Sequence, residues 1–152
     1  MGKSKHTMAL EEMVAHPEKI GICEDVNWKY VEFPFYNRKG RMLGAVDVII
    51  RTVDGGLFYV EYKCHDAVKP RLHAAEQLMI AKKGMHDEYK WDANRLLYVH
   101  DDLQPELFIP SDKFLKIDPN SAEDVEKLRF KGHNDKLATL AEHYIQLRKN
   151  VR

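Results

Sequence analysis

The apolar residues of the chain change their spacing several times, and each spacing predicts a helix or a strand. From Thr7 to Pro17 they recur at the helical period, which predicts a helix with Thr7 as its N-cap. Pro17 and Gly21 end this helix, because neither residue continues it. Residues 28–36 then alternate apolar and polar side chains, as a half-buried strand does. The face of this strand that we expect to be buried consists of Val31, Phe33 and Phe35.

Two further strands follow, joined by a tight turn. Residues 42–52 and 57–63 are apolar runs of strand length, and the Asp-Gly-Gly sequence at 54–56 is a strong hairpin signal. Residues 70–84 return to the helical period, and we expect that helix to stop near its glycine. Residues 95–99 form a fourth strand. Because a helix precedes it, this strand is expected to run parallel to the third, through a right-handed crossover.

The remainder of the chain is first rich in proline and then helical. The proline-rich stretch contains at most a short strand at residues 114–117. The predicted order is α-β-β-β-α-β-loop-α, an α/β domain with a small mixed central β-sheet flanked by helices. We expect a single domain over residues 1–152, with residues 120–152 as a C-terminal helical extension. The apolar stripe of that extension is Leu137, Leu140, Ala141, Tyr144 and Ile145.

Composition places the chain among ordinary globular proteins. It has 152 residues, 44% hydrophobic and 32% charged, with 24 Lys+Arg balanced by 24 Asp+Glu. A formal net charge of zero excludes a globally basic protein that coats nucleic acid, although a locally basic face is compatible with it. The two cysteines, Cys23 and Cys64, cannot form a disulfide framework, which favours a reducing, cytoplasmic setting. Neither a membrane span nor a secretory signal is expected from the sequence.

Three charged residues stand out because they lie in otherwise apolar strands. Glu61 and Lys63 are two residues apart, so their side chains share one face of the third strand. Asp47 is embedded in the apolar run of the second strand, and the hairpin folds it back toward Glu61. Two carboxylates at close range repel and raise a pKa unless a divalent cation neutralises them.

Such a pair of carboxylates suits a hard divalent cation. Oxygen ligands favour Mg²⁺, and Mn²⁺ is expected to substitute for it. A cation there could polarise a phosphoryl oxygen and activate a water that Lys63 orients or helps to deprotonate. The competing interpretation is a surface pair of Glu61 and Lys63 with a solvent-facing Asp47, because Glu-x-Lys alone is a common tripeptide.

In these features the chain resembles the PD-(D/E)XK nuclease superfamily, in the style of its RecB-like and Holliday-junction-resolvase-like members. The resemblance covers roughly residues 7–100 in element order. It rests on a Gly-x-x-Asp strand containing Asp47, a turn, an apolar strand ending in Glu61-x-Lys63, and a helix with the sequence Ala-Glu-Gln-Leu. Val46 stands where the name of the motif has proline, a departure that many members share.

The resemblance implies a restriction-endonuclease-like fold with an α-β-β-β-α-β core, and a role for each matching residue. Asp47 and Glu61 would be the metal ligands, and Lys63 the catalytic lysine. The backbone carbonyl of Tyr62 would complete the metal site. Gln77 matches the glutamine that RecB-like members carry on the helix after the lysine strand.

These nucleases usually add a glutamate from the first helix, and the sequence offers Glu11, Glu12 and Glu18. Glu11 and Glu18 border the apolar stripe of that helix, whereas Glu12 points further away. A residue at the border can reach the active edge of the sheet, so we favour Glu11, although each of the three could equally be a solvated surface acid.

The implied activity is Mg²⁺-dependent hydrolysis of DNA. An endonuclease is favoured over an exonuclease, although no residue decides between the two modes, and a homodimer is a possible assembly. The alternative is a non-catalytic nucleic-acid-binding or assembly domain that keeps the nuclease fold, and RNA instead of DNA is not excluded by any residue. In a neutral chain, contact with phosphates must come from local basic clusters. The residues expected to make it are Lys69, Arg71, Lys82, Lys83, Arg148 and Lys149.

Overall fold

The structure of the chain, a computed structural model, describes residues 2–93, 95–110 and 113–130. The helices are α1 (Lys5–Ala15), the 3₁₀ helix η1 (Pro17–Ile20), α2 (Val68–Tyr89) and α3 (Ala122–Glu126). The strands are β1 (Val26–Tyr36), β2 (Met42–Thr52), β3 (Leu57–Lys63), β4 (Arg95–His100), β5 (Gln104–Ile109) and β6 (Lys113–Lys116). The predicted C-terminal stripe, Arg148 and Lys149 lie outside the described residues. No described helix is long and apolar enough to cross a membrane.

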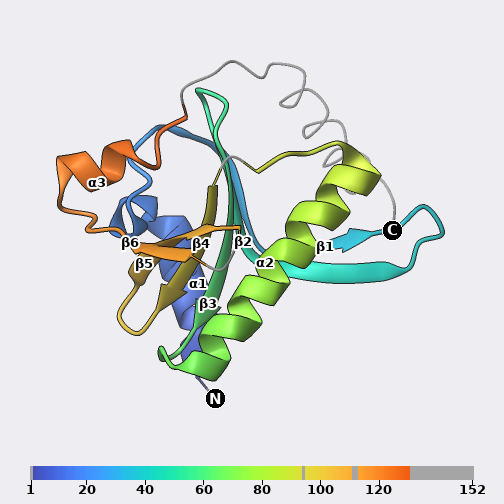
Figure 1. Cartoon of the computed structure of the whole chain (residues 1–152), viewed down its shortest axis with the longest axis horizontal. Helices are drawn as coiled ribbons and strands as arrows, with labels where there is room; N and C mark the ends of the chain where they lie inside the picture. The colour runs from blue at the N-terminus through green and yellow to red at the C-terminus, as the bar shows by residue number, and fades with distance from the viewer. Residues whose placement is uncertain (1, 94, 111–112, 131–152) are drawn as a thin grey trace.

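The strands form one mixed sheet in the order β1-β2-β3-β4-β5-β6. β3 and β4 are parallel, as predicted, and α2 is the crossover between them, whereas every other neighbouring pair is antiparallel. The predicted α/β class with a mixed central sheet is therefore confirmed. Figure 1 shows α2 crossing in front of the sheet and α1 behind it.

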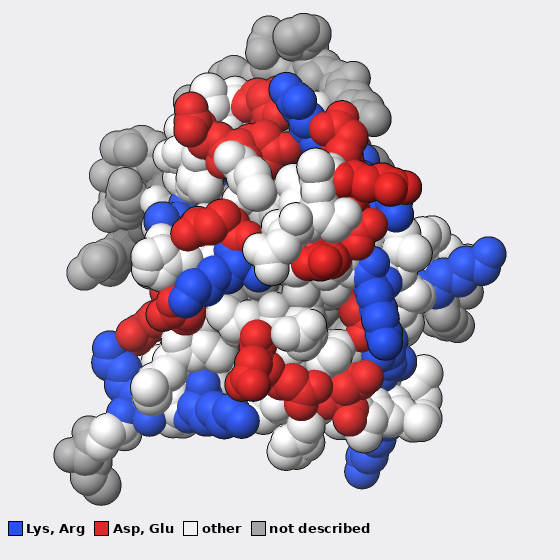
Figure 2. All heavy atoms as spheres, turned by 90° about the vertical axis from the view of Figure 1, so that its left-hand side faces the viewer, with Lys and Arg blue, Asp and Glu red and all other residues white. Residues whose placement is uncertain are grey.

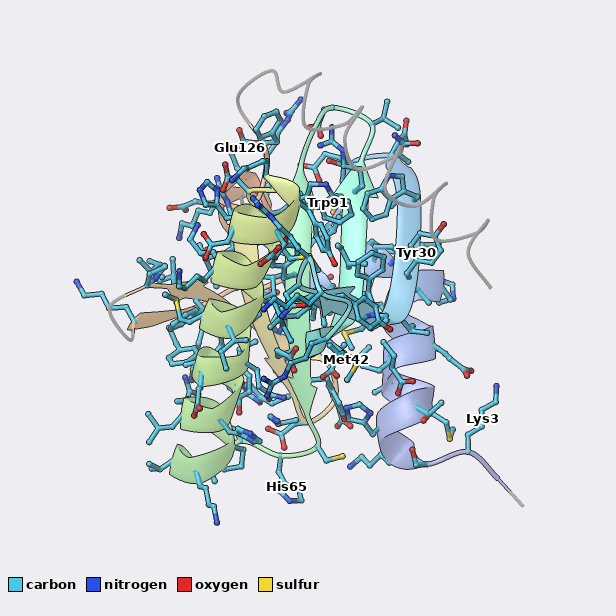
Figure 3. All side chains as sticks on the ribbon, turned by 90° about the vertical axis from the view of Figure 1, so that its right-hand side faces the viewer. Lys3, Tyr30, Met42, His65, Trp91 and Glu126 are labelled. Atoms are coloured by element: carbon cyan, nitrogen blue, oxygen red, sulfur yellow. The ribbon has the colours of Figure 1, made fainter. Side chains whose placement is uncertain are left out.

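The sheet is covered on both faces, so each strand buries side chains on two sides. α2 packs on one face through residues such as Leu78 and Met85, against Ile49 and Tyr59 of the sheet. α1 and η1 cover the opposite face. Figure 3 shows α1 and α2 on either side of the sheet, with His65, which follows β3, at the end where both helices begin. That end of the sheet therefore lies between two helix N-termini.

The alternation of β1 breaks in the middle of the strand. Glu32 has a positive φ of 50°, and the register places it opposite Asp47. Tyr30 and Phe33 consequently both pack on the α2 side, although they are three residues apart. The prediction that Val31 shares the buried face of Phe33 is wrong, because Val31 is 40% exposed. In Figure 1 the β1–β2 hairpin extends sideways from the rest of the sheet.

Helix α2 runs through Gly84 to Tyr89, so the predicted stop at Gly84 is wrong. A Cβ on Gly84 would lie 2.6 Å from Cε2 of Phe35, and one on Gly44 would lie 2.8 Å from Cζ of the same ring. Both glycines therefore make room for Phe35 where the turned hairpin meets α2. The helix ends instead at Lys90, which has a left-handed backbone.

Two other boundaries differ from the sequence prediction. Ser4, not Thr7, caps α1, and its side chain accepts a hydrogen bond from the Thr7 N–H at 3.1 Å. The stretch predicted to be a loop contains β5, which pairs with β4 despite Pro105. Proline has no N–H to donate, but the Pro105 carbonyl still accepts from Ile117 at 3.0 Å.

Candidate active site

Asp47 and Glu61 come together where β2 and β3 part. The paired register between these strands ends at Val48 and Val60, so Asp47 and Glu61 are the next opposed positions. Past this last pair, the N–H of Tyr62 in β3 donates to the side chain of Asp47 instead of to a backbone carbonyl of β2. The acceptor is Asp47 Oδ2, at 2.9 Å. The Asp47 N–H in turn points to Glu61 Oε1 at 3.4 Å. The two carboxylates predicted to be neighbours are thus tied to each other's strand, and the Tyr62 backbone lies beside them.

Glu61 is the most unusual charged group of this site, because it is only 1% exposed. Its Oε2 is buried and has no hydrogen-bond partner among the described residues. Burial raises the pKa of Glu61 well above its ordinary range, the charge of Asp47 raises it further, and Lys63 lowers it only in part. An acidic oxygen that is buried without a partner is costly unless a cation or a proton satisfies it.

Lys63 projects from the same face of β3 as Glu61, toward α2. Its Nζ donates to Gln77 Oε1 at 2.7 Å, and His73 Nδ1 lies 3.4 Å from the same nitrogen. The structure therefore brings the predicted Gln77 to the predicted lysine, which sequence spacing alone did not establish. The position of His73 beside Lys63 was not predicted from the sequence.

From α1, the side chain that reaches the carboxylates is His6. Its Nε2 lies 3.5 Å from Asp47 Oδ2, and its ring centroid lies 5.7 Å from that of Tyr62. Sequence reasoning missed His6 because the helix was expected to begin at Thr7. The signal was present, since His6 continues the buried stripe of Leu10 and Met13 at the spacings i, i+4 and i+7.

The three glutamates of the N-terminal region have other partners. Glu11 pairs with Lys3 at 2.8 Å, and Glu12 with Lys19 at 2.6 Å. Glu18 lies 3.2 Å from His16 Nδ1. Within the described residues, none of the three makes a hydrogen bond or ion pair with Asp47 or Glu61. The assignment of Glu11 to the site stays a prediction, and its side chain lies elsewhere in this structure.

Arg71, which the sequence predicts to contact phosphate, is bound by two carboxylates in this structure, and its contact with phosphate stays a prediction. Its guanidinium donates to both oxygens of the buried Glu106, at 2.9 and 2.8 Å, and to Asp66 at 2.7 Å. It also lies over the rings of Tyr98 and Phe114. Because two carboxylates already neutralise it, Arg71 joins the start of α2 to β5.

The groups around Arg71 include three that could in principle hold a metal ion. One ligand atom each from Asp66, His100 and Glu106 lies within 4.8 Å of the others. His100 Nε2 is 2.6 Å from Glu106 Oε2, and its Nδ1 is 2.7 Å from Asp101. The guanidinium of Arg71 already supplies the positive charge that these carboxylates need. We therefore assign the cluster a structural role.

The predicted lysines are spread along α2. Lys69 helps to line a pocket of about 540 Å³ that borders Lys63. Lys82 lines a separate pocket of about 290 Å³ with Arg95 and Lys127. Lys83 pairs with Asp87 at 2.7 Å and lies ten residues beyond His73, or roughly 15 Å along the helix axis. On the face that carries α3, acidic and basic side chains are interspersed (Figure 2). Among the three predicted lysines of α2, Lys69 is the one beside the site, because it shares its pocket with Lys63.

The fold and the site define an α/β protein whose mixed six-stranded sheet carries two carboxylates and a lysine where β2 and β3 cease to pair. No protein-family model matches the chain, and no curated protein matches it. Among solved structures, it is similar to a repair endonuclease from Pyrococcus abyssi, with 26% identity and a TM-score of 0.43. It is also similar to the protein in an EndoMS complex with double-stranded DNA, with 20% identity and a TM-score of 0.37.

Both similarities are partial. Each covers 66% of this chain but only 38% and 37% of the respective solved chains. The chain thus spans well under half the length of the proteins it matches. Because the TM-scores are also low, the function proposed below rests on the residues of the site.

Proposed function

We propose that this protein is a metal-dependent nuclease that hydrolyses phosphodiester bonds of DNA at the site of Asp47, Glu61 and Lys63. The observation that carries the proposal is the buried Glu61 carboxylate, with one oxygen lacking a partner and a second carboxylate beside it. A carboxylate pair without a cation is unfavourable in such a position, whereas a divalent ion satisfies both charges at once.

The residues present fit a hard divalent cation. Asp47 and Glu61 supply carboxylate oxygens, and we propose the Tyr62 carbonyl as a further ligand because its backbone adjoins Asp47. Such a donor set suits Mg²⁺, with Mn²⁺ as a substitute. His6 faces the same Asp47 oxygen and offers an imidazole nitrogen, a donor that Mn²⁺ accepts more readily than Mg²⁺ does.

The chain's own groups supply the remaining parts of a hydrolytic site. The cation, when bound, polarises a phosphoryl oxygen and promotes ionisation of water. Lys63 lies on the same side of the sheet as Glu61, so its amine can orient the attacking water and take part in its deprotonation. Gln77 holds that amine by the hydrogen bond of 2.7 Å. The water then displaces the leaving oxygen in line, and the two carboxylates stay in place.

A polyanionic substrate fits the surroundings of Lys63. The adjoining pocket is lined by the basic side chains of Lys63 and Lys69 and the apolar side chains of Pro70 and Leu72, with His73 and the carboxylate of Glu76 completing it. Its cations can neutralise phosphates, and its apolar wall can contact sugar or base. We propose DNA as the substrate and an endonucleolytic mode. The alternative is a domain of the same fold that binds nucleic acid without cleaving it.

We also propose that the protein forms a homodimer and that it is cytoplasmic. A homodimer would pool the basic side chains of two chains whose formal net charge is zero. Cys23 and Cys64 are both free thiols in this structure, which supports the proposed cytoplasmic setting. Sedimentation of the purified protein with and without DNA tests the dimer.

The decisive experiment is incubation with supercoiled plasmid, single-stranded DNA and branched DNA in the presence of Mg²⁺, Mn²⁺ or EDTA. The proposal is supported if cleavage needs the cation and if Asp47→Asn and Glu61→Gln each abolish it. Glu12→Gln is the matched control, because this surface carboxylate pairs with Lys19 away from the site. DNA binding without cleavage under all cation conditions would favour the non-catalytic alternative, and nicking of the circular plasmid separates endonuclease from exonuclease.

A further inference from the structure

The amine of Lys63 has two acceptors on α2, and the second belongs to a residue without a role so far. Gln77 Oε1 lies 2.7 Å from Lys63 Nζ, and His73 Nδ1 lies 3.4 Å from it. We propose that His73 is a positioning residue that, together with Gln77, fixes the direction of the Lys63 amine. This inference rests on the proposed nuclease function, because it concerns the lysine of that site.

The spacing of the two acceptors explains how they act together. His73 and Gln77 are four residues apart on one helix, so they lie one above the other on the same face. The nitrogen of a lysine side chain has three positions besides its carbon, which hold three N–H groups in the ammonium and two N–H groups and a lone pair in the neutral amine. When two N–H groups are directed at these fixed acceptors, the third position is turned away from both of them. Glu61 lies on the same face of β3 as Lys63, so this third position is available to a water on the side of the sheet that carries Glu61.

The start of α2 is held firmly enough for this purpose. Arg71, two residues before His73, binds the buried Glu106 of β5 and Asp66 of the preceding loop. The Tyr98 hydroxyl donates to Asp66 at 2.9 Å, which ties the same loop to β4. The helical turn that carries His73 is therefore anchored to two strands, and a rigid element places a functional side chain more accurately than a loop does.

His73 itself has no structural task that would explain its position. It is an exposed residue and belongs to neither of the two apolar cores. Its ring borders the pocket beside Lys63. Replacing it is expected to leave the fold intact, so an effect on Lys63 can be read separately from an effect on stability.

The test compares His73→Leu, which removes the acceptor, with His73→Asn, whose side-chain oxygen can take the place of Nδ1. His86→Leu is the matched control, because His86 is an exposed histidine of the same helix and pairs with Asp92. The first readout needs no activity. It is the rate at which an amine-reactive ester modifies Lys63, measured by peptide mass spectrometry with Lys69 as the internal reference.

We expect His73→Leu to raise the modification rate of Lys63 about threefold. The same substitution should lower kcat for DNA cleavage about tenfold, as the loss of one hydrogen bond to a charged group predicts. KM and the affinity for Mg²⁺ should be unchanged. His73→Asn should keep most of both properties, and His86→Leu should match the wild type. Equal Lys63 modification in all proteins, or a higher KM with unchanged kcat, would overturn the inference. If wild-type protein cleaves no DNA but Lys63 modification responds as expected, the nuclease proposal fails and the contact stands.

Discussion

The backbone N–H of Tyr62 donates a hydrogen bond of 2.9 Å to the side chain of Asp47, where a regular sheet would offer it a backbone carbonyl. Strands β2 and β3 can therefore separate at this point without leaving a buried donor unsatisfied. Opposite Asp47, the positive φ of Glu32 turns β1 in the same region. The buried carboxylate of Glu61 lies beside this point.

Removing either carboxylate should abolish cation-dependent cleavage. Asp47→Asn and Glu61→Gln keep the shape of each side chain but remove a charge that the cation needs. We expect no measurable cleavage by either variant. We also expect both to lose affinity for Mg²⁺, measured by isothermal titration calorimetry. An Asp47→Asn protein that binds Mg²⁺ as tightly as the wild type would contradict the proposed ligand.

Glu61 should make the stability of the cation-free protein depend on pH. Its folded pKa is raised, so ionisation of Glu61 destabilises the fold. The contribution of Glu61 to the free energy of unfolding is fully present below the pKa that this group has in the unfolded chain. It is lost as the pH rises through the pKa of the group in the folded protein. We expect the denaturation midpoint in EDTA to fall over that interval for wild type, and Glu61→Gln to reduce the fall.

Adding Mg²⁺ at neutral pH should restore the stability that ionisation of Glu61 removes, and it should do so in the wild type only. A ligand at 100 times its Kd stabilises the folded state by about 2.7 kcal/mol. Glu61→Gln should show little of this gain. An equal gain in both proteins would place the cation elsewhere.

Lys63 should be needed for catalysis and not for cation binding. Lys63→Ala removes the amine that orients the water, and a group of this kind contributes roughly 10²- to 10⁴-fold to rate. Mg²⁺ affinity should be unchanged, because the amine is not a ligand. Lys69→Ala is the matched control, and we expect it to raise KM while kcat is retained.

Arg71 should be required for stability. Burial alone would raise the pKa of Glu106, but hydrogen bonds from Arg71 and His100 hold it below its ordinary value. Arg71→Ala leaves the buried Glu106 carboxylate with one partner fewer and should cost about 3–5 kcal/mol in urea denaturation. The stabilisation by Glu106 is present above its unfolded pKa and is lost as the pH falls through its folded pKa. Combining Arg71→Ala with Glu106→Gln should recover part of the loss.

Gly84→Ala should destabilise the protein although alanine favours helices. The gain in helix propensity is about 1 kcal/mol. The new methyl group would lie 2.6 Å from the Phe35 ring, and overpacking of a filled core costs roughly 1–3 kcal/mol. We expect a net loss of stability, measured by thermal denaturation. In a Phe35→Leu background the same substitution should become neutral or stabilising, and an unchanged loss there would show that Phe35 is not the cause.

Much of the architecture could be predicted because it depends on local patterns. The second and third predicted strands, residues 42–52 and 57–63, have the bounds of β2 and β3. Two-residue alternation and a tight turn are properties of short segments, so they are visible in the sequence. The same local rules placed Glu61 and Lys63 on one face and brought Asp47 opposite Glu61.

What the sequence alone left undetermined depends on contacts between distant segments. At Gly84, inside α2, the space of a side chain is occupied by the Phe35 ring from β1, and Pro105 stands in β5 with β4 as its pairing partner. Neither partner lies within the segment that it contacts.

The same division applies to the site. The sequence by itself determined the pair of carboxylates and the lysine, because strand period and hairpin pairing are enough to bring them together. Only the tertiary structure decided that His6 reaches Asp47, that His73 reaches Lys63 and that Arg71 is neutralised by Glu106. These partners come from helices and strands far apart in the chain, and the packing of α1 and α2 on the two faces of the sheet sets their distances.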